Sequence, residues 1–208
     1  HGAMLVGTHA YGALLNALGV RLPANYYTED VDIARYATIQ LAVSPNRTFL
    51  DLLRTSGLHF VEVPELDVRR PSTSFRVRGA KLRVDLLVPG DARYRSVRIP
   101  ELAAHATALP HFGYLLAEPR DAVILGRDHV IPVRLPDAAR YAVHKAVVAT
   151  LRAGTSPAKR DKDLAQAAVL MHALSSRYPG DLEAAAAALP AAARRRFAQS
   201  LRDVVAML

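Results

Sequence analysis

The sequence predicts an α/β protein of the α+β type, in which a small mixed sheet is followed by a C-terminal helical domain. A short apolar run at residues 4–6 opens into apolar positions at helical spacing, which is typical of a strand followed by a helix. Residues 75–88 have the pattern of a β-hairpin. After Leu135 the composition changes to helix. We therefore expect one domain over residues 4–135 and a helical domain over residues 136–208.

The composition indicates a globular protein. The chain has 208 residues, of which 51% are hydrophobic, so it can bury a sizeable core, and this composition argues against intrinsic disorder. It contains no cysteine, which excludes disulfides and thiolate metal sites. No stretch reaches the roughly 18 apolar residues that span a bilayer, and no signal peptide is visible. We expect a cytoplasmic protein with no membrane partner.

The charge balance is basic. Lysine and arginine number 27 against 19 acidic residues, a formal charge of +8. An excess of this size favours a polyanionic partner, such as nucleic acid or a phosphorylated ligand. The alternative is an arginine- and alanine-rich genome, which would raise the charge without any such partner. The arginine triplet at 194–196 lies on the last predicted helix and is more typical of a solvated face than of a nucleic-acid contact.

The first helix begins at a turn that could bind an anion. The apolar run stops at Gly7 and Thr8, and helical spacing then continues to Leu18, with Gly19 at the position that follows a helix C-terminus. Gly7 allows a sharp turn, and the first N–H groups of the helix are free to bind a phosphate. An ordinary strand-to-helix turn would have the same pattern.

An acidic strand follows at residues 29–35. Asp30 and Asp32 are two positions apart, so both side chains project from one face, while Val31 and Ile33 project from the other. Two neighbouring carboxylates repel each other, and burial increases the free energy needed to ionise both. A divalent cation offsets their charge, so the pair is the first indication of a metal site.

The remaining elements follow from turn residues and periodicity. Ser44 and Pro45 predict a helix start, and Gly57 ends that helix. We expect a strand at 58–63, a short helical stretch at 101–108 and a second hairpin at 121–134. The predicted helices of the C-terminal domain cover residues 137–152, 159–177, 181–189 and 191–208.

The hairpin at 75–88 places a third carboxylate. A two-residue turn at Gly79 and Ala80 pairs Ser74 with Asp85, so that Asp85 shares a face with a row of cations. The other face carries Phe75, Val77, Leu82, Val84, Leu86 and Val88 and is the expected core side. A solvated charged face is the alternative reading. The row of cations consists of Arg76, Arg78, Lys81 and Arg83.

Three carboxylates on two strands suit metal-dependent transfer of a phosphoryl or nucleotidyl group. If the strands are neighbours, Asp30, Asp32 and Asp85 can hold two Mg²⁺ ions, with Mn²⁺ as the alternative. One ion would activate the attacking hydroxyl and the other would neutralise the triphosphate and the leaving group. Backbone N–H groups at Gly7 and Thr8 would hold the phosphates.

The order of these motifs resembles the nucleotidyltransferase superfamily, which includes the palm of DNA polymerase beta, CCA-adding enzymes and aminoglycoside nucleotidyltransferases. The matching features are Gly-Thr before a helix, Asp-x-Asp on a strand, and a lone Asp inside an apolar strand. Segments 136–149 and 158–170 resemble a little-characterised bacterial nucleotidyltransferase family that is similar to the toxins of abortive-infection toxin–antitoxin systems. The resemblance covers roughly residues 4–172.

The resemblance implies roles for particular residues. Metal binding and catalysis would belong to Asp30, Asp32 and Asp85. Nucleotide binding would belong to Gly7, Thr8, Lys159, Lys162 and Asp163. His144 and Lys145 also lie in a matching segment, where a packing role and a catalytic role for His144 are both open. Thr8 replaces the serine usual in the superfamily but keeps the hydroxyl.

The resemblance also implies an enzyme that moves a nucleoside monophosphate from an NTP to an acceptor hydroxyl. RNA, such as a tRNA end, is the leading acceptor, and a protein or a small molecule is the alternative. The enzyme would be a toxin if a cognate antitoxin restrains it. A non-catalytic nucleotide- or RNA-binding module with the same fold is the competing interpretation. The long gap between Thr8 and Asp30 predicts an inserted loop at 21–28 over the site, with Tyr26 and Tyr27 expected to pack.

Overall fold

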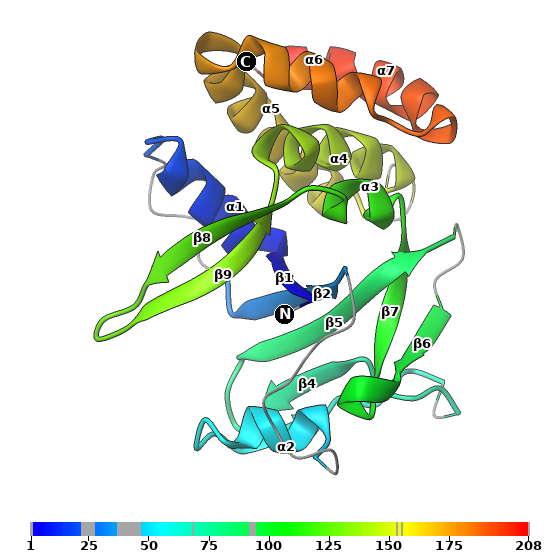
Figure 1. Cartoon of the computed structure of the whole chain (residues 1–208). Helices are drawn as coiled ribbons and strands as arrows, with labels where there is room; N and C mark the ends of the chain where they lie inside the picture. Colours follow the sequence, from blue (N-terminus) through cyan, green and yellow to red (C-terminus); the bar gives the residue numbers. More distant parts are fainter. Residues whose placement is uncertain are drawn as a thin grey trace.

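The fold was analysed in a computed structural model, which describes residues 2–21, 28–36, 47–67, 69–91, 95–152, 154 and 156–207. Helices α4–α7 gather at one end of the molecule, and the main sheet with helix α2 lies at the other (Figure 1). The mixed sheet followed by C-terminal helices confirms the predicted fold class.

The main sheet has seven strands and both parallel and antiparallel pairs. Its central path runs β1-β2-β5-β4-β3, and β7 pairs with β5 and β6. β2 and β5 are parallel, whereas β1 with β2 and β4 with β5 are antiparallel. The strands are β1 (Ala3–Val6), β2 (Asp30–Arg35), β3 (Phe60–Glu62), β4 (Ser74–Val77), β5 (Arg83–Gly90), β6 (Arg95–Ile99) and β7 (Ala104–Pro110).

The register of the β4–β5 hairpin agrees with the sequence prediction. Ser74 pairs with Asp85, and Arg76 pairs with Arg83. The connection is longer than the expected two residues, because β4 ends at Val77 and β5 begins at Arg83. All four cations of the row are exposed, and the residues expected to face the core pack there. The parallel pairing of β2 with β5 then makes the two acidic strands neighbours.

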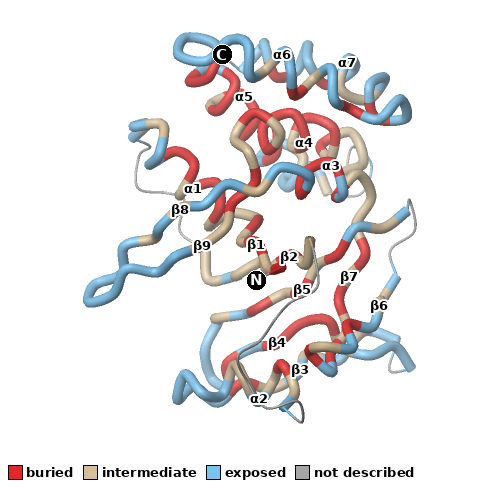
Figure 2. The backbone as a smooth tube through the Cα atoms, in the orientation of Figure 1, coloured by how far each residue is buried: buried red, intermediate tan, exposed pale blue. Residues whose placement is uncertain are grey.

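Each face of the sheet covers a separate hydrophobic cluster. On one face, residues of β4 and β5 pack with α2 (Phe49–Arg54), where the rings of Phe49 and Phe75 meet edge to face with centroids 5.2 Å apart. On the other face, β1 and α1 pack with the helical region. Figure 2 shows buried stretches in β1, α1, α4 and α5, the elements that contribute to this second cluster. Strand β5 lies between the two clusters, because its alternate residues Leu86 and Leu87 pack on opposite ones.

The remaining elements surround the second cluster. The helices are α1 (Gly7–Ala17), α3 (Phe112–Leu116), α4 (Ala138–Leu151), α5 (Pro157–Arg177), α6 (Pro179–Ala187) and α7 (Ala191–Val205). The hairpin expected at 121–134 is confirmed as β8 (Pro119–Leu125) paired with β9 (Val130–Pro136). Asp137 caps α4, because its carboxylate accepts hydrogen bonds from the N–H groups of Ala139 and Arg140. No helix in the described part of the chain is long and apolar enough to cross a bilayer.

Two predicted elements need correction. Helix α2 begins at Phe49, and its cap is Thr48, whose side chain forms a reciprocal capping box with Asp51. The predicted start at Ser44 and Pro45 lies outside the described residues. The helical stretch expected at 101–108 is wrong, because a single 3₁₀ turn (Pro100–Leu102) leads into strand β7.

The alanines of β7 explain the second error. Ala104, Ala106 and Ala108 are buried at a period of two and pack in the cluster beneath β5. Alanine has a high helix propensity, but packing in the sheet decides the conformation here. Strand β6 and helix α3, in the same part of the chain, were not predicted.

Candidate active site

A pocket of about 310 Å³ lies between the strands β2 and β5 and the helices α4 and α5. The structure brings every candidate site residue from the sequence to this one pocket. The candidates in its wall are Gly7, Thr8, Asp30, Asp32, Asp85, Lys159, Lys162 and Asp163. Thr28 also lines it, whereas residues 22–27 of the loop expected over the site, including Tyr26 and Tyr27, lie outside the described residues.

One wall of the pocket is acidic. Asp32 pairs directly with Asp85 across the parallel strands β2 and β5, and Asp30 lies two residues before Asp32 on the same face. Burial, together with the neighbouring charge of Asp85, raises the pKa of the Asp32 carboxyl to about 6. Lys145 and Lys162 act against this rise. At neutral pH the ionised carboxylates of this wall therefore repel each other, and this repulsion lowers the stability of the fold.

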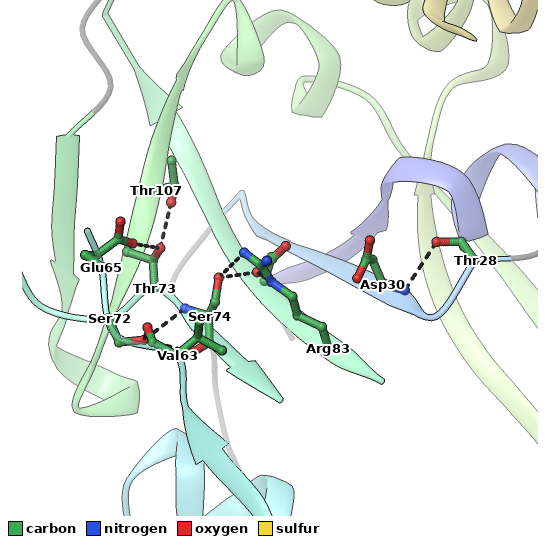
Figure 3. Close-up of polar contacts among 10 residues, drawn as sticks. Thr28, Asp30, Val63, Glu65, Ser72, Thr73, Ser74, Arg83 and Thr107 are labelled. Carbon is green, nitrogen blue, oxygen red and sulfur yellow. Dashed lines mark hydrogen bonds and ion pairs between the residues drawn. The ribbon is translucent and has the colours of Figure 1, made fainter. Parts of the chain in front are cut away.

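The carboxylates differ in their partners. Asp85 accepts hydrogen bonds from the Ser74 hydroxyl and from Nε of Arg83, the latter at 2.8 Å. Figure 3 shows Ser74 and Arg83 side by side, and a guanidinium nitrogen of Arg83 is 2.7 Å from the Ser74 hydroxyl oxygen. On the neighbouring strand the backbone N–H of Asp30 donates to Thr28 Oγ1 at 3.2 Å. The cation that ends the row on β5 thus holds one member of the acidic wall.

The acidic wall has the chemistry of a divalent-metal site. Its donors are carboxylate oxygens, which Mg²⁺ and Mn²⁺ prefer, and the raised pKa of Asp32 is the shift that a bound cation reverses. Among the described residues no three acidic or histidine side chains are arranged to hold one ion as they stand, and Asp85 is held by Arg83. The wall therefore suits a divalent ion in two respects, because its donors are carboxylate oxygens and the pairing of β2 with β5 brings them together.

The turn into α1 approaches this wall closely. Gly7 has a φ of +65°, and a Cβ atom on it would lie 1.8 Å from Oδ2 of Asp32. Glycine is therefore required twice, for the backbone conformation and for the contact with Asp32. Val6, the residue before α1, gives no side-chain cap, so the N–H groups at the start of this helix remain available to a ligand.

The opposite wall is cationic and comes from the helical region. Nζ of Lys162 lies 3.1 Å from the hydroxyl oxygen of Thr8 and joins α5 to the turn at Gly7. Asp163, only 1% exposed, forms ion pairs with Lys145 at 2.8 Å and with Arg152 at 2.6 Å. This carboxylate therefore orients Lys145 on α4 and Arg152, the residue that follows α4. We call Lys145, Arg152, Lys159 and Lys162 the cationic wall.

Sequence reasoning assigned no nucleotide-binding role to Lys145 or Arg152. The available signal was the spacing of two helical turns between Lys145 and Arg152, which puts both on one face of the helix expected over 137–152. In the structure Arg152 is the residue that follows α4. Their partner Asp163 is on another helix, so the ion pairs depend on how α4 packs against α5. The contact of Ser74 with Asp85 did follow from the register predicted for the hairpin.

Tyr141 connects the helical region to the turn. Its hydroxyl donates to the carbonyl oxygen of Gly7 at 2.9 Å. We expect Tyr141→Phe to lower stability by about 1 kcal/mol, because the Gly7 carbonyl loses its partner, and to reduce catalytic turnover by loosening the turn. Thermal unfolding and kcat/KM would measure the two effects.

Tyr114→Phe is the matched control. Its hydroxyl donates to the carbonyl oxygen of Ala185 at 2.7 Å, away from the pocket. This variant should lose a similar amount of stability and keep its turnover. Equal turnover in both variants would show that the Tyr141 contact does not position the turn.

An acidic wall, a helix N-terminus and a cationic wall around one pocket have the chemistry that suits a phosphorylated ligand and its metal ions. The chain matches the family model described as Nucleotidyltransferase over residues 1–190, and it belongs to that family. No curated protein and no solved structure shows significant similarity to it. The protein is thus a nucleotidyltransferase, and its substrate is a nucleoside triphosphate.

Proposed function

We propose that the protein transfers a nucleoside monophosphate from an NTP to an acceptor hydroxyl in a Mg²⁺-dependent reaction that releases pyrophosphate, with Mn²⁺ as the alternative ion. The observation that carries this proposal is the register of β2 and β5, which places Asp32 beside Asp85 in the pocket that the cationic wall completes. The sequence resemblance and the family point to the same reaction.

The metal ligands in this proposal are Asp30, Asp32 and Asp85. Two bound divalent ions would lower the pKa of the attacking hydroxyl and neutralise the charge that develops on the leaving pyrophosphate. Arg83 forms an ion pair with Asp85, and Asp85 would exchange this partner for the ion.

The triphosphate would bind opposite the carboxylates. The N–H groups at the start of α1, with Gly7 and Thr8, would hold its oxygens through backbone hydrogen bonds. The cationic wall would neutralise the remaining charge, with Asp163 keeping two of its members in place. In this arrangement residues 4–135 carry the carboxylates, and residues 136–208 close the cleft with cations.

RNA is the acceptor that the surface supports best. The exposed row of cations along the β4–β5 hairpin and its connection begins next to Asp85. Three of its members, Arg76, Arg78 and Lys81, make no ion pair with the described residues. Such a row beside the site suits a phosphate backbone, which binds through cations irrespective of sequence. A tRNA end is the leading case, and a protein or a small-molecule hydroxyl is the alternative.

We place the reaction in the cytoplasm, where NTPs and tRNA are available, and extend the proposal to a toxin that a cognate antitoxin restrains. This extension rests on segments 136–149 and 158–170, which resemble abortive-infection toxins. Expression of the wild type should arrest growth, and Asp30→Ala should relieve the arrest. An arrest that persists in Asp30→Ala would remove nucleotidyl transfer as its cause.

The transfer reaction can be tested directly. Purified protein would be incubated with each α-labelled NTP, Mg²⁺ and total RNA, with Asp85→Asn as the matched variant. Label should appear on RNA with the wild type and should be absent with Asp85→Asn. If no label reaches RNA, protein or small molecules while NTP still binds, the protein is instead a binding module with this fold.

Lys162 offers a test of the phosphate site. We expect Lys162→Met to raise KM for the NTP about tenfold, because a charge-assisted contact is worth roughly 1.4 kcal/mol or more. Lys162→Arg keeps the charge and should recover most of the affinity. An unchanged KM in Lys162→Met would mean that its contact with Thr8 is structural only.

A further inference from the structure

Part of the pocket wall is apolar and comes from elements that carry none of the carboxylates. The junction of β7 with α3 and the C-terminal part of α4 supply it. The side chains are Leu109, Pro110, Phe112, Leu115, Val148 and Leu151. A triphosphate and its metal ions are charged and gain no favourable contact from apolar side chains. This stretch is therefore available to bind an apolar part of the substrate. We call it the apolar stretch.

His144 lies on α4 beside the apolar stretch. It lines the pocket, its ring centroid is 6.0 Å from that of Phe112, and the residue is only 7% exposed. Neither of its ring nitrogens has a hydrogen-bond partner within the described residues. A buried polar group without a hydrogen-bond partner lowers the stability of the fold by about 1–3 kcal/mol. An unpaired histidine in a pocket wall therefore indicates that a ligand supplies the partner.

His144 is a neutral hydrogen-bonding group. Burial, together with the electrostatic effects of Lys145, His111 and Arg152, lowers its pKa to about 3. A neutral imidazole has one N–H donor and one acceptor nitrogen, which is the pairing that the edges of nucleobases also offer. Gln166 is likewise buried without a partner among the described residues, but it does not line the pocket.

We propose that the apolar stretch receives the nucleobase of the NTP and that His144 hydrogen-bonds to the edge of the base, which makes it the specificity-determining residue. This inference rests on the proposed function, and it adds the base subsite and the residue that reads it. Apolar and aromatic side chains accept the faces of any base. A buried hydrogen-bonding group discriminates between bases, because a base that cannot pair with it leaves it unpaired and binds more weakly.

The competing explanation is that His144 only fills space between α4 and α3. The two explanations predict different behaviour for His144→Phe, which keeps the ring and removes both nitrogens. If the histidine is kept for a ligand, this variant should lose base preference while its melting temperature stays equal or rises. A packing residue would show no change in preference.

The experiment measures equilibrium binding of ATP, GTP, CTP, UTP and inorganic tripolyphosphate in the presence of Mg²⁺. The variants are His144→Phe, His144→Gln, which keeps a donor and an acceptor, and His172→Phe on the exposed face of α5. Wild type and His172→Phe should prefer one NTP by about tenfold or more. His144→Phe should lose that preference with tripolyphosphate affinity unchanged, and His144→Gln should recover part of it.

The outcomes separate this inference from the function on which it rests. Equal affinity of the wild type for all four NTPs, or an unchanged preference in His144→Phe, would overturn the base subsite and leave the transfer reaction standing. Failure to bind both NTPs and tripolyphosphate would overturn the proposed function itself. If His144→Phe does not fold, His144→Leu is the smaller apolar variant that gives the same comparison.

Discussion

Gly7→Ala is expected to reduce nucleotidyl transfer by about 100-fold or more. The added Cβ would lie 1.8 Å from Oδ2 and 2.7 Å from Cγ of Asp32, so the carboxylate and the turn cannot both keep their positions. The φ of +65° is itself strained for alanine by roughly 1–2 kcal/mol. Misplacing a catalytic group by 1 Å is enough for a loss of about this size. Single-turnover transfer of labelled NTP would measure it.

Gly12→Ala is the matched control on the same helix. Nothing lies within 4 Å of a Cβ at that position, and its φ is not positive. Alanine in a helix interior should stabilise the protein by roughly 0.5–1 kcal/mol, with transfer unchanged. Comparable losses of activity in both variants would show that the close approach of Gly7 to Asp32 has no special importance.

Asp32→Asn is expected to abolish transfer, by about 1,000-fold or more, and at the same time to stabilise the metal-free protein at high pH. The folded state raises the pKa of Asp32 from 3.8 to about 6, so its ionisation opposes folding. Below pH 4 the group is protonated in both states and costs nothing. The cost accrues between pH 4 and 6 and is complete above pH 6, where it reaches up to about 3 kcal/mol.

Denaturant unfolding in EDTA at pH 4 and pH 8 would measure this effect. Wild type and Asp32→Asn should have similar stability at pH 4, and the variant should be more stable at pH 8. Added Mg²⁺ should stabilise the wild type at pH 8 far more than the variant, because a bound cation removes the repulsion. Asp121→Asn is the control, since that carboxylate is 84% exposed in a surface ion pair with Arg134. If Asp32→Asn were less stable than the wild type at pH 8, the conclusion that ionised Asp32 opposes folding would be wrong.

The acidic wall was predictable because each of its parts is a local pattern. Alternation places Asp30 and Asp32 on one face of β2, and the hairpin signal sets Asp85 opposite Ser74. Only the adjacency of β2 and β5 is not local. It joins strands that are some 50 residues apart, and the prediction had to assume it.

The errors arose where local preference and packing disagree. The alanines of β7 favour a helix in isolation, yet they are buried between β5 and β6 as a strand. The predicted start at Ser44 and Pro45 lies outside the described residues, and the described helix α2 is capped by Thr48 and Asp51, whose spacing is also that of a helix cap. The ion pairs of Asp163 were beyond a sequence argument because they depend on how two helices pack.

The hydrophobic cluster that joins β1 and α1 to the helical region determines how the chain can be truncated and how it unfolds. Leu15 and Val6 belong to the same buried set as Val147 and Leu170, so neither stretch of chain has a complete interior alone. A fragment that stops near Leu135 would expose the surface that α4 covers and would aggregate rather than fold into a minimal enzyme. Heat should therefore melt both stretches in one calorimetric transition, and activity should disappear at the same temperature.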